Sequence, residues 1–207
     1  MIDQLDSNIL QVLSTYKGLI FDMDGTLIDS MPAHLDAWKV TAEHYHFPFD
    51  RTWLNGLGGM PGEAIVELIN DKYDVNLLPI EVSEFRMDVF ERFENNTGLV
   101  AITNQILNHF YGLKKLAVGT GSPKLSAMHL LKEAGILAKL DAVVTANDVQ
   151  LHKPHPDTFL LAASNIDLPA NTCIVFEDTT LGMQAAHRAG MDCFMVDDNQ
   201  LTLHPCS

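Results

Sequence analysis

The chain has 207 residues, with 27 acidic against 13 basic side chains and a formal net charge of −14. This excess of negative charge repels nucleic acid and anionic membranes, so we expect neither as a partner. No stretch approaches the roughly 18 consecutive apolar residues of a membrane span. The first ten residues carry acids where a secretory signal carries Lys or Arg, and the three cysteines lack metal-ligand spacing. We therefore expect a cytoplasmic protein with reduced thiols, as a monomer or weak oligomer.

The pattern of apolar runs predicts an α/β fold. Residues 1–16 indicate a leading helix, and short apolar runs then recur at 18–21, 116–118, 142–146, 173–176 and 193–196. None of the runs alternates, which is typical of parallel strands buried on both faces. Helical patterns separate the later runs, and two of them stop at Gly135 and Gly190, where a left-handed C-terminal residue is expected. The prediction is a doubly wound parallel five-stranded sheet.

One connection is far longer than the others. Between the first and second strands lie helical patterns at 32–45, 62–73 and 82–93, each with an apolar stripe on one face. Such stripes indicate a small helical core of their own. We predict a core domain of residues 1–31 and 100–207, with a helical cap domain of residues 32–99 inserted after the first strand.

Polar residues follow the predicted strands where those strands end. The first strand runs into Asp22 and Asp24, the second into "GTGS" at 119–122, and the fourth into "EDTT" at 177–180. Lys153 lies in "HKPHPD" before the fourth strand. Because ligands of open α/β sheets bind beyond the carboxyl ends of the strands, these residues should converge. A cluster of carboxylates suits a hard cation such as Mg²⁺, and a lysine beside it suits a phosphate oxygen.

The chemistry that this set suggests is phosphoryl transfer through an aspartyl-phosphate. Asp22 would attack phosphorus, while Asp24 would protonate the leaving oxygen and later deprotonate water. Thr120 and Gly121 would bind further phosphate oxygens at the start of a helix, where the dipole favours an anion. Ser122 is a further candidate for a substrate contact.

The chain resembles the haloacid dehalogenase-like superfamily of phosphatases. The motifs "DMDGT", "GTGS", "HKPHPD" and "FEDTTLGMQAA" occur in the order of that family, across about residues 17–196. The resemblance implies that Asp22 is the nucleophile, that Asp24 is the acid-base, and that Thr120 and Lys153 hold the phosphate. It also implies Mg²⁺ bound by Asp22, the Asp24 carbonyl and Asp178, with Glu177 in support. The predicted substrate and phosphate contacts are Gly25, His34, Thr120, Gly121, Ser122 and Lys153.

Within the superfamily the chain is most similar to the β-phosphoglucomutase-like branch, and especially to bacterial phosphatases that act on fructose 1-phosphate. The resemblance implies a magnesium-dependent phosphatase for small sugar phosphates. Two alternatives stay open: a β-phosphoglucomutase and a non-catalytic phosphate-binding protein. A mutase must hold a second phosphate, yet no Lys or Arg occurs from Leu54 to Asp71. Arg86 is a substitute from the next helix. His34 and His152 are either pocket residues or ordinary packing residues.

Overall fold

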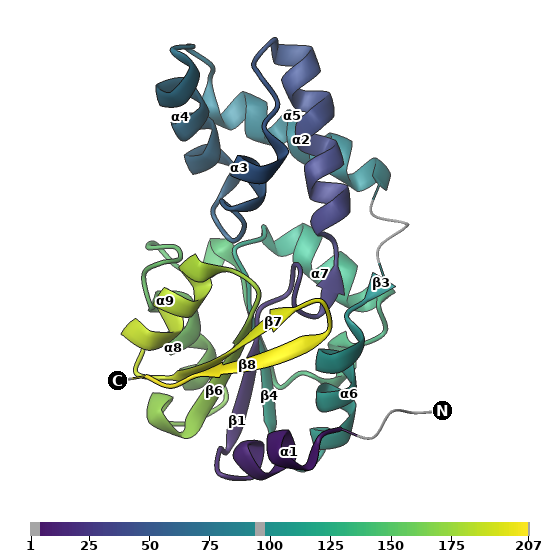
Figure 1. Cartoon of the computed structure of the whole chain (residues 1–207), viewed down its shortest axis with the longest axis vertical. Coiled ribbons are helices and arrows are strands. Elements are labelled where there is room, and N and C mark those ends of the chain that lie inside the picture. Colours follow the sequence, from purple (N-terminus) through teal and green to yellow (C-terminus); the bar gives the residue numbers. More distant parts are fainter. Residues whose placement is uncertain (1–4, 94–97, 207) are drawn as a thin grey trace.

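The centre of the protein is a six-stranded sheet in the order β5-β4-β1-β6-β7-β8 (Figure 1). The computed structural model describes residues 5–93 and 98–206. The strands of this sheet are β1 (Gly18–Phe21), β4 (Lys115–Gly119), β5 (Ala142–Val144), β6 (Cys173–Glu177), β7 (Asp192–Asp197) and β8 (Gln200–His204). All neighbours pair in parallel except β7 and β8. The predicted doubly wound parallel architecture is therefore confirmed.

The sixth strand is the difference from the predicted five. Strand β8 returns antiparallel to β7 through a tight turn at Asp198 and Asn199, whose φ angles are 44° and 61°. Asn and Asp tolerate this left-handed backbone, which suits a two-residue hairpin. The sequence "QLTLH" alternates polar and apolar residues, as a half-exposed edge strand does, so a search for continuous apolar runs misses it.

Helices cover both faces of the sheet. Successive side chains of β1 point to opposite faces and therefore pack against different helices. Leu19 and Phe21 pack with helices α1 (Ser7–Ser14), α6 (Ala101–Phe110) and α7 (Lys124–Glu133). Ile20 packs on the other face with helices α8 (Asp157–Asn165) and α9 (Thr180–Arg188). Burial of β1 on both faces explains its unbroken apolar sequence. The predicted leading helix is present as α1, and residues 1–4 lie outside the described residues.

Helix α7 buries one face and exposes the other, although both faces carry apolar side chains. Leu125 is 89% exposed and Met128 is 36% exposed, whereas Ala127, Leu130 and Leu131 are buried. The buried face of α7 is thus turned from the one that includes Leu125. Gly135 and Gly190 follow α7 and α9 with φ angles of 69° and 74°, as expected for left-handed C-terminal residues.

The insertion after β1 forms a separate group of helices above the sheet (Figure 1). Its helices are α2 (Met31–Tyr45), α3 (Arg51–Asn55), α4 (Gly62–Tyr73) and α5 (Pro79–Phe93). They bury a hydrophobic cluster that includes Leu35, Trp38 and Val66. Strands β2 (Ile28–Asp29) and β3 (Gly98–Leu99) pair antiparallel where the chain leaves the sheet domain and returns to it. Helix α3, which was not predicted, is only five residues long and is capped by Asp50, which accepts a hydrogen bond from Trp53 N at 3.0 Å.

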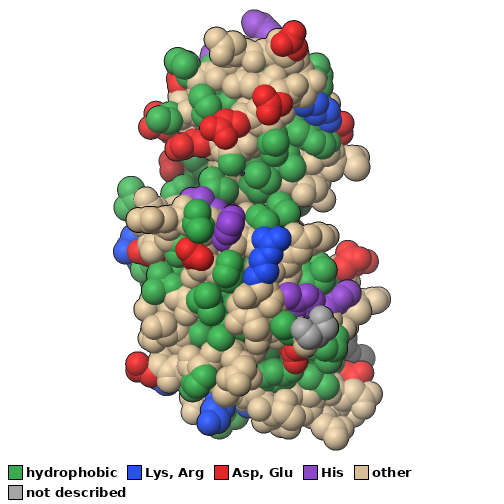
Figure 2. Space-filling model, turned by 90° about the vertical axis from the view of Figure 1, so that its left-hand side faces the viewer, with side chains coloured by type: hydrophobic (Ala, Val, Ile, Leu, Met, Phe, Trp, Pro, Cys, Tyr) green, Lys and Arg blue, Asp and Glu red, His purple; other side chains and the backbone are tan. Residues whose placement is uncertain are grey.

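Charge is unevenly distributed between the two tiers of the molecule. Acidic side chains gather over the upper, helical tier on the face shown in Figure 2. Among the described residues, no helix is both long and apolar enough to cross a bilayer.

Candidate active site

The carboxyl ends of β1 and β4 lie beneath the helical insertion and enclose with it a cavity of about 310 Å³. Asp22 and Asp24 reach it from the end of β1, and Thr120, Gly121 and Ser122 from the end of β4. The other side of the cavity consists of residues from the insertion: Leu35, Trp38, Leu54, Met60, Ile65 and Arg86. Hence the polar groups predicted from the strand ends face a mostly apolar wall.

Lys153 joins two buried carboxylates at the base of the site. Its Nζ donates to Asp22 Oδ1 at 2.5 Å and to Glu177 Oε1 at 2.7 Å. Burial alone would lower the pKa of Lys153, but the two carboxylates raise it above its ordinary value. The pKa of Asp22 is raised to about 7, above all by burial. Lys153 lowers it and the charges of Glu177 and Asp24 raise it, so the ammonium offsets the increase only in part. The single ammonium group of Lys153 therefore pairs with two carboxylates and cannot neutralise both of them.

Asp22, Glu177 and Asp178 form a cluster whose ligand oxygens lie within 4.8 Å of one another. Burial raises the pKa of Asp178 well above its ordinary value, and the charges of Glu177 and Asp22 raise it further. Crowded carboxylates of this kind fit a hard divalent cation, which would relieve their repulsion. The donors of this chain thus suit Mg²⁺.

The three carboxylates differ in the freedom of their oxygens. Glu177 Oε2 accepts hydrogen bonds from the backbone N of Thr179 at 2.6 Å and from its hydroxyl at 2.8 Å, while Oε1 accepts from Lys153. In the described part of the chain, the one hydrogen bond to Asp178 from another side chain is long, at 3.3 Å from Thr26. Asp178 and Asp22 are therefore the better candidates for direct metal ligands, and Glu177 holds its neighbours in place.

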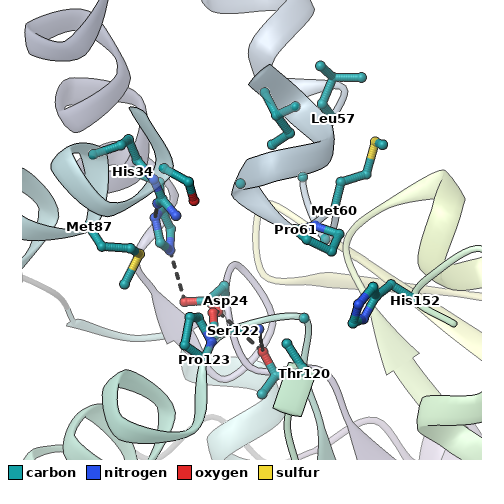
Figure 3. A pocket seen from close by; sticks show the side chains of 18 of the residues that line it. Asp24, His34, Leu57, Met60, Pro61, Met87, Thr120, Ser122, Pro123 and His152 are labelled. Atoms are coloured by element: carbon teal, nitrogen blue, oxygen red, sulfur yellow. Dashed lines mark hydrogen bonds and ion pairs between the residues drawn. The ribbon is translucent and has the colours of Figure 1, made fainter. Parts of the chain in front are cut away.

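Asp24 lies in a different environment, rich in hydrogen-bond donors (Figure 3). Ser30 Oγ donates to Asp24 Oδ1 and Ser122 Oγ donates to Oδ2, both at 2.6 Å. Thr120 Oγ1 lies 3.4 Å from Oδ2, and His34 Nε2 lies 3.2 Å from Oδ1. Burial would raise the pKa of Asp24, but the hydrogen bonds from His34 and the two serines lower it to about 2. The side chain is thus fully engaged by polar donors, which leaves its backbone carbonyl as the predicted metal ligand.

His34 connects Asp24 to the insertion through Arg86. Arg86 Nη1 lies 2.8 Å from His34 Nδ1, and the imidazole stacks on Phe90 with ring centroids 4.0 Å apart. Because a guanidinium can only donate, Nδ1 must accept, so the imidazole proton is on Nε2 and points at Asp24. Burial also lowers the pKa of His34, which agrees with a neutral ring. Arg86 itself is 8% exposed, and its Nε has no hydrogen-bond partner within the described chain.

Glycines bring the insertion close to the phosphate-binding loop that was predicted at Thr120 and Gly121. A Cβ on Gly121 would lie 2.6 Å from the carbonyl oxygen of Gly59, and a Cβ on Gly58 would lie 3.2 Å from Thr179 Cγ2. Any side chain at Gly121 would push the two tiers apart. The loop at 58–59 therefore lies directly against Gly121 and Thr179.

Six predicted site residues line this cavity: Asp22, Asp24, His34, Thr120, Gly121 and Ser122. Lys153, Glu177 and Asp178 are linked to it through Asp22 and do not line it themselves. Gly25, predicted as a phosphate contact, lies against Asp178 instead: a Cβ on Gly25 would be 2.2 Å from Asp178 Oδ2, and its φ of 81° favours glycine. His152 lines the cavity, which favours the pocket interpretation of that residue. The sequence reasoning missed Ser30, Thr26 and Thr179 as partners of Asp24, Asp178 and Glu177. Their hydroxyls lie inside or beside the predicted motifs, which was the available signal.

Comparison with known proteins identifies the family of the chain. Residues 19–196 match the haloacid dehalogenase-like hydrolase family. The chain belongs to this family. It is 39% identical over 181 residues to the fructose-1-phosphate phosphatase YqaB of Escherichia coli, covering 86% of this chain and 94% of that protein. It is 28% identical over 196 residues to the β-phosphoglucomutase of Bacillus subtilis, covering 89% and 84% of the two chains.

Among solved structures, a hydrolase from Pseudomonas syringae superposes with a TM-score of 0.78 at 26% identity, covering 86% of this chain and 83% of that one. These matches confirm the predicted family and the predicted Rossmann-like core. Several of the similar family members are phosphatases. They support the prediction that this protein is a phosphoric monoester hydrolase.

Proposed function

We propose that this protein is a Mg²⁺-dependent phosphatase that hydrolyses small sugar phosphates through a phosphorylated Asp22. The observation that carries the proposal is the pair Asp22 and Asp24, which face one cavity with opposite electrostatic surroundings. A nucleophile and a proton carrier with different pKa values are what a two-step phosphoryl transfer requires.

In the first step, Asp22 attacks phosphorus in line with the ester oxygen. Lys153 bonds Asp22 Oδ1, which keeps the carboxylate oriented and leaves Oδ2 for the attack. Asp24 gives a proton to the departing sugar oxygen as the P–O bond breaks. Free Asp24 is ionised at neutral pH, and the negative charge of the arriving phosphate raises its pKa, so proton uptake accompanies substrate binding.

In the second step, Asp24 takes a proton from water, and the water oxygen attacks the phosphorus of phospho-Asp22. The acyl-phosphate P–O bond breaks, which releases orthophosphate and restores Asp22. Thr120, Gly121 and Ser122 lie at the start of α7 where they would bind phosphate oxygens. When bound by Asp22, Asp178 and the Asp24 carbonyl, Mg²⁺ would supply positive charge that offsets the charge of the transferring phosphoryl group.

Residues 32–99 are proposed to act as a mobile cap over this chemistry. The glycine contacts of the loop at 58–59 with Gly121 and Thr179 support a closed state that excludes water from the cavity. An apolar wall that contains Trp38 suits one face of a sugar ring, whereas Glu63 and Arg86 supply polar contacts. The similarity to YqaB supports fructose 1-phosphate, or a related hexose phosphate, among the better substrates.

A β-phosphoglucomutase is the second candidate, because Arg86 lies in the cavity wall and has an unused Nε–H. A mutase needs a cation for the distal phosphate, and Arg86 is the only Lys or Arg that the insertion contributes to the described cavity wall. Its engagement with His34 and the presence of Glu63 in the same wall favour the phosphatase.

The test is a panel of phosphorylated sugars assayed for orthophosphate with Mg²⁺ and with EDTA. We expect metal-dependent release, with hexose 1-phosphates among the faster substrates. A second assay mixes β-glucose 1-phosphate with a trace of its bisphosphate and follows free phosphate and glucose 6-phosphate together. Efficient glucose 6-phosphate formation with little free phosphate would establish the mutase, and no turnover of any compound would leave a phosphate-binding protein.

A further inference from the structure

A second hollow lies at the opposite edge of the sheet from the candidate active site. It is about 550 Å³ in volume and lies where β1, β4 and β5 begin, between the loop at 111–115 and the residues at 138–141. We refer to it as the lysine hollow, because Lys17, Lys114, Lys115 and Lys139 line it. In Figure 1 this edge is at the foot of the sheet, near α1.

The concentration of positive charge in the lysine hollow is unusual for this chain. It gathers four of the 13 basic side chains of a protein with 27 acids. Asp141 is the acidic residue that lines the hollow, and it pairs with Lys115 at 2.7 Å. In the described parts of the chain, the other three lysines form no ion pair with a carboxylate, although carboxylates are abundant elsewhere.

The partners of these three lysines are neutral or absent. Lys114 Nζ donates to the backbone carbonyls of Ser14 and Tyr16, and partial burial lowers its pKa. Lys139 Nζ donates to the amide oxygen of Asn108 at 2.5 Å. Only the backbone of Lys17 is hydrogen-bonded, to Thr172 and Lys115, and among residues 5–93 and 98–206 its ammonium group has no hydrogen bond or ion pair. Folding thus accounts for the position of Lys114 but leaves three positive charges without a counterion in one hollow.

We propose that the lysine hollow is a binding site for a small molecule with linked phosphate groups. Ammonium groups bind phosphate oxygens as point charges from several directions, whereas planar carboxylates are better matched by the fork of arginine, and no arginine lines the hollow. Separate ammonium groups also suit a ligand with several phosphates rather than one. This site is independent of the proposed phosphatase reaction, which takes place at the other end of the strands.

The rim of the lysine hollow indicates where an organic portion of the ligand would lie. Tyr111 is 56% exposed and Leu113 is 73% exposed, and both line the hollow. An exposed tyrosine ring offers a face on which a planar base can stack. Inorganic polyphosphate and a nucleotide share the phosphate chemistry and differ in their use of this ring.

The test is calorimetric titration of the full chain with tripolyphosphate and with ATP, in EDTA. The informative variant is Lys17→Gln/Lys139→Gln, since both side chains are on the surface or partly exposed and Gln can keep the bond of residue 139 to Asn108. The matched control is Lys39→Gln/Lys132→Gln, which removes the same charge from exposed helix positions. We expect affinity for tripolyphosphate to fall at least about tenfold in the first variant and less than about twofold in the control.

Equal affinity in the two variants overturns the proposal. So does binding that persists in Lys17→Gln/Lys139→Gln and competes with substrate in the phosphatase assay, because the ligand then occupies the active site. Tighter binding of ATP that is lost in Tyr111→Ser assigns the site to a nucleotide. Equal binding of both probes, unaffected by Tyr111→Ser, assigns it to an inorganic phosphate chain. Thermal melts of each variant in buffer alone check that the fold is retained.

Discussion

Asp22 and Asp24 are two residues apart, yet the protein surrounds them in opposite ways. Asp22 lies with Glu177 and Asp178 around a single ammonium, and its pKa is raised to about 7. Asp24 accepts hydrogen bonds from Ser30 and Ser122 and contacts His34, and its pKa is lowered to about 2. The difference teaches that the neighbours decide the role of a carboxylate. Asp22 shares one ammonium with other carboxylates, whereas Asp24 is surrounded by hydrogen-bond donors.

The largest effect is expected from Asp22→Asn. Loss of the nucleophile should lower turnover by at least about 10⁴-fold, because residues that act as one catalytic unit are not replaced by their neighbours. Single-turnover assays with a labelled phosphate should show no phosphoprotein. The control is Asp36→Asn, which removes a charge from the exposed surface of α2. Appreciable turnover in Asp22→Asn would contradict the mechanism.

The same variant tests the electrostatic half of the comparison. Without metal, a carboxyl with a raised pKa destabilises the folded state increasingly as pH rises from its unfolded value towards 7. Asn cannot ionise, so Asp22→Asn should melt at a higher temperature than the parent in EDTA, with a larger advantage at pH 8 than at pH 5. If the difference in melting temperature between the variant and the parent becomes smaller as pH rises, the crowded carboxylates do not destabilise the folded state.

Asp24→Asn should have a smaller effect on rate and the opposite effect on stability. Removal of an acid-base group typically lowers turnover by about 10²- to 10⁴-fold. In EDTA we expect the free energy of unfolding to fall by about 1–3 kcal/mol, because the partly buried hydrogen bonds from Ser30, Ser122 and His34 lose a charged acceptor. Thermal melts of Asp22→Asn and Asp24→Asn at one pH make the contrast direct. Equal shifts in the same direction would remove the distinction between the two environments.

Contacts between sequence motifs could be predicted from the sequence, whereas contacts that depend on how helices pack could not. The parallel sheet and the meeting of Asp22, Lys153 and Asp178 were predicted from the apolar runs and from the rule that ligands bind beyond the carboxyl ends of the strands. The order of the strands was not predicted. The pairing of His34 with Arg86 joins residues from helices α2 and α5, whose packing is set by side-chain shape rather than by a motif. Strand β8 was missed because an edge strand lacks the continuous apolar run of a buried one.

The metal cluster gives a third test, in which Asp178 and Glu177 are compared. Asp178→Asn should raise the Mg²⁺ concentration for half-maximal activity by about 10- to 100-fold, since its oxygens are nearly free of protein donors. Glu177→Gln should change it less, because Glu177 is bonded to Lys153 and Thr179. Magnesium titrations of the two variants measure the difference. If Glu177→Gln needs more Mg²⁺ than Asp178→Asn, then Glu177 is the direct metal ligand and Asp178 the supporting residue.

The smallest effect in this series is expected from Arg86→Gln, which tests whether the insertion helps to set the state of Asp24. Arg86 donates to His34 Nδ1 and so keeps the imidazole proton on the nitrogen that faces Asp24. Gln offers a weaker donor and can also turn its carbonyl towards His34. If the lost hydrogen bond is worth about 1.4 kcal/mol, kcat should fall about tenfold.

Arg86→Lys should recover most of that loss, because an ammonium also donates to Nδ1. Recovery by lysine separates hydrogen-bond donation from packing, since Arg86 also lies over Trp38 with its guanidinium carbon 5.5 Å from the ring centroid. Arg51→Gln, on the exposed ion pair with Asp36, is the control for charge. A loss confined to KM would assign Arg86 to the sugar alone. A loss in kcat that lysine restores would show that the hydrogen bond from Arg86 to His34 helps to orient the donor that faces Asp24. The cap would then contribute to the surroundings of Asp24 but not to those of Asp22.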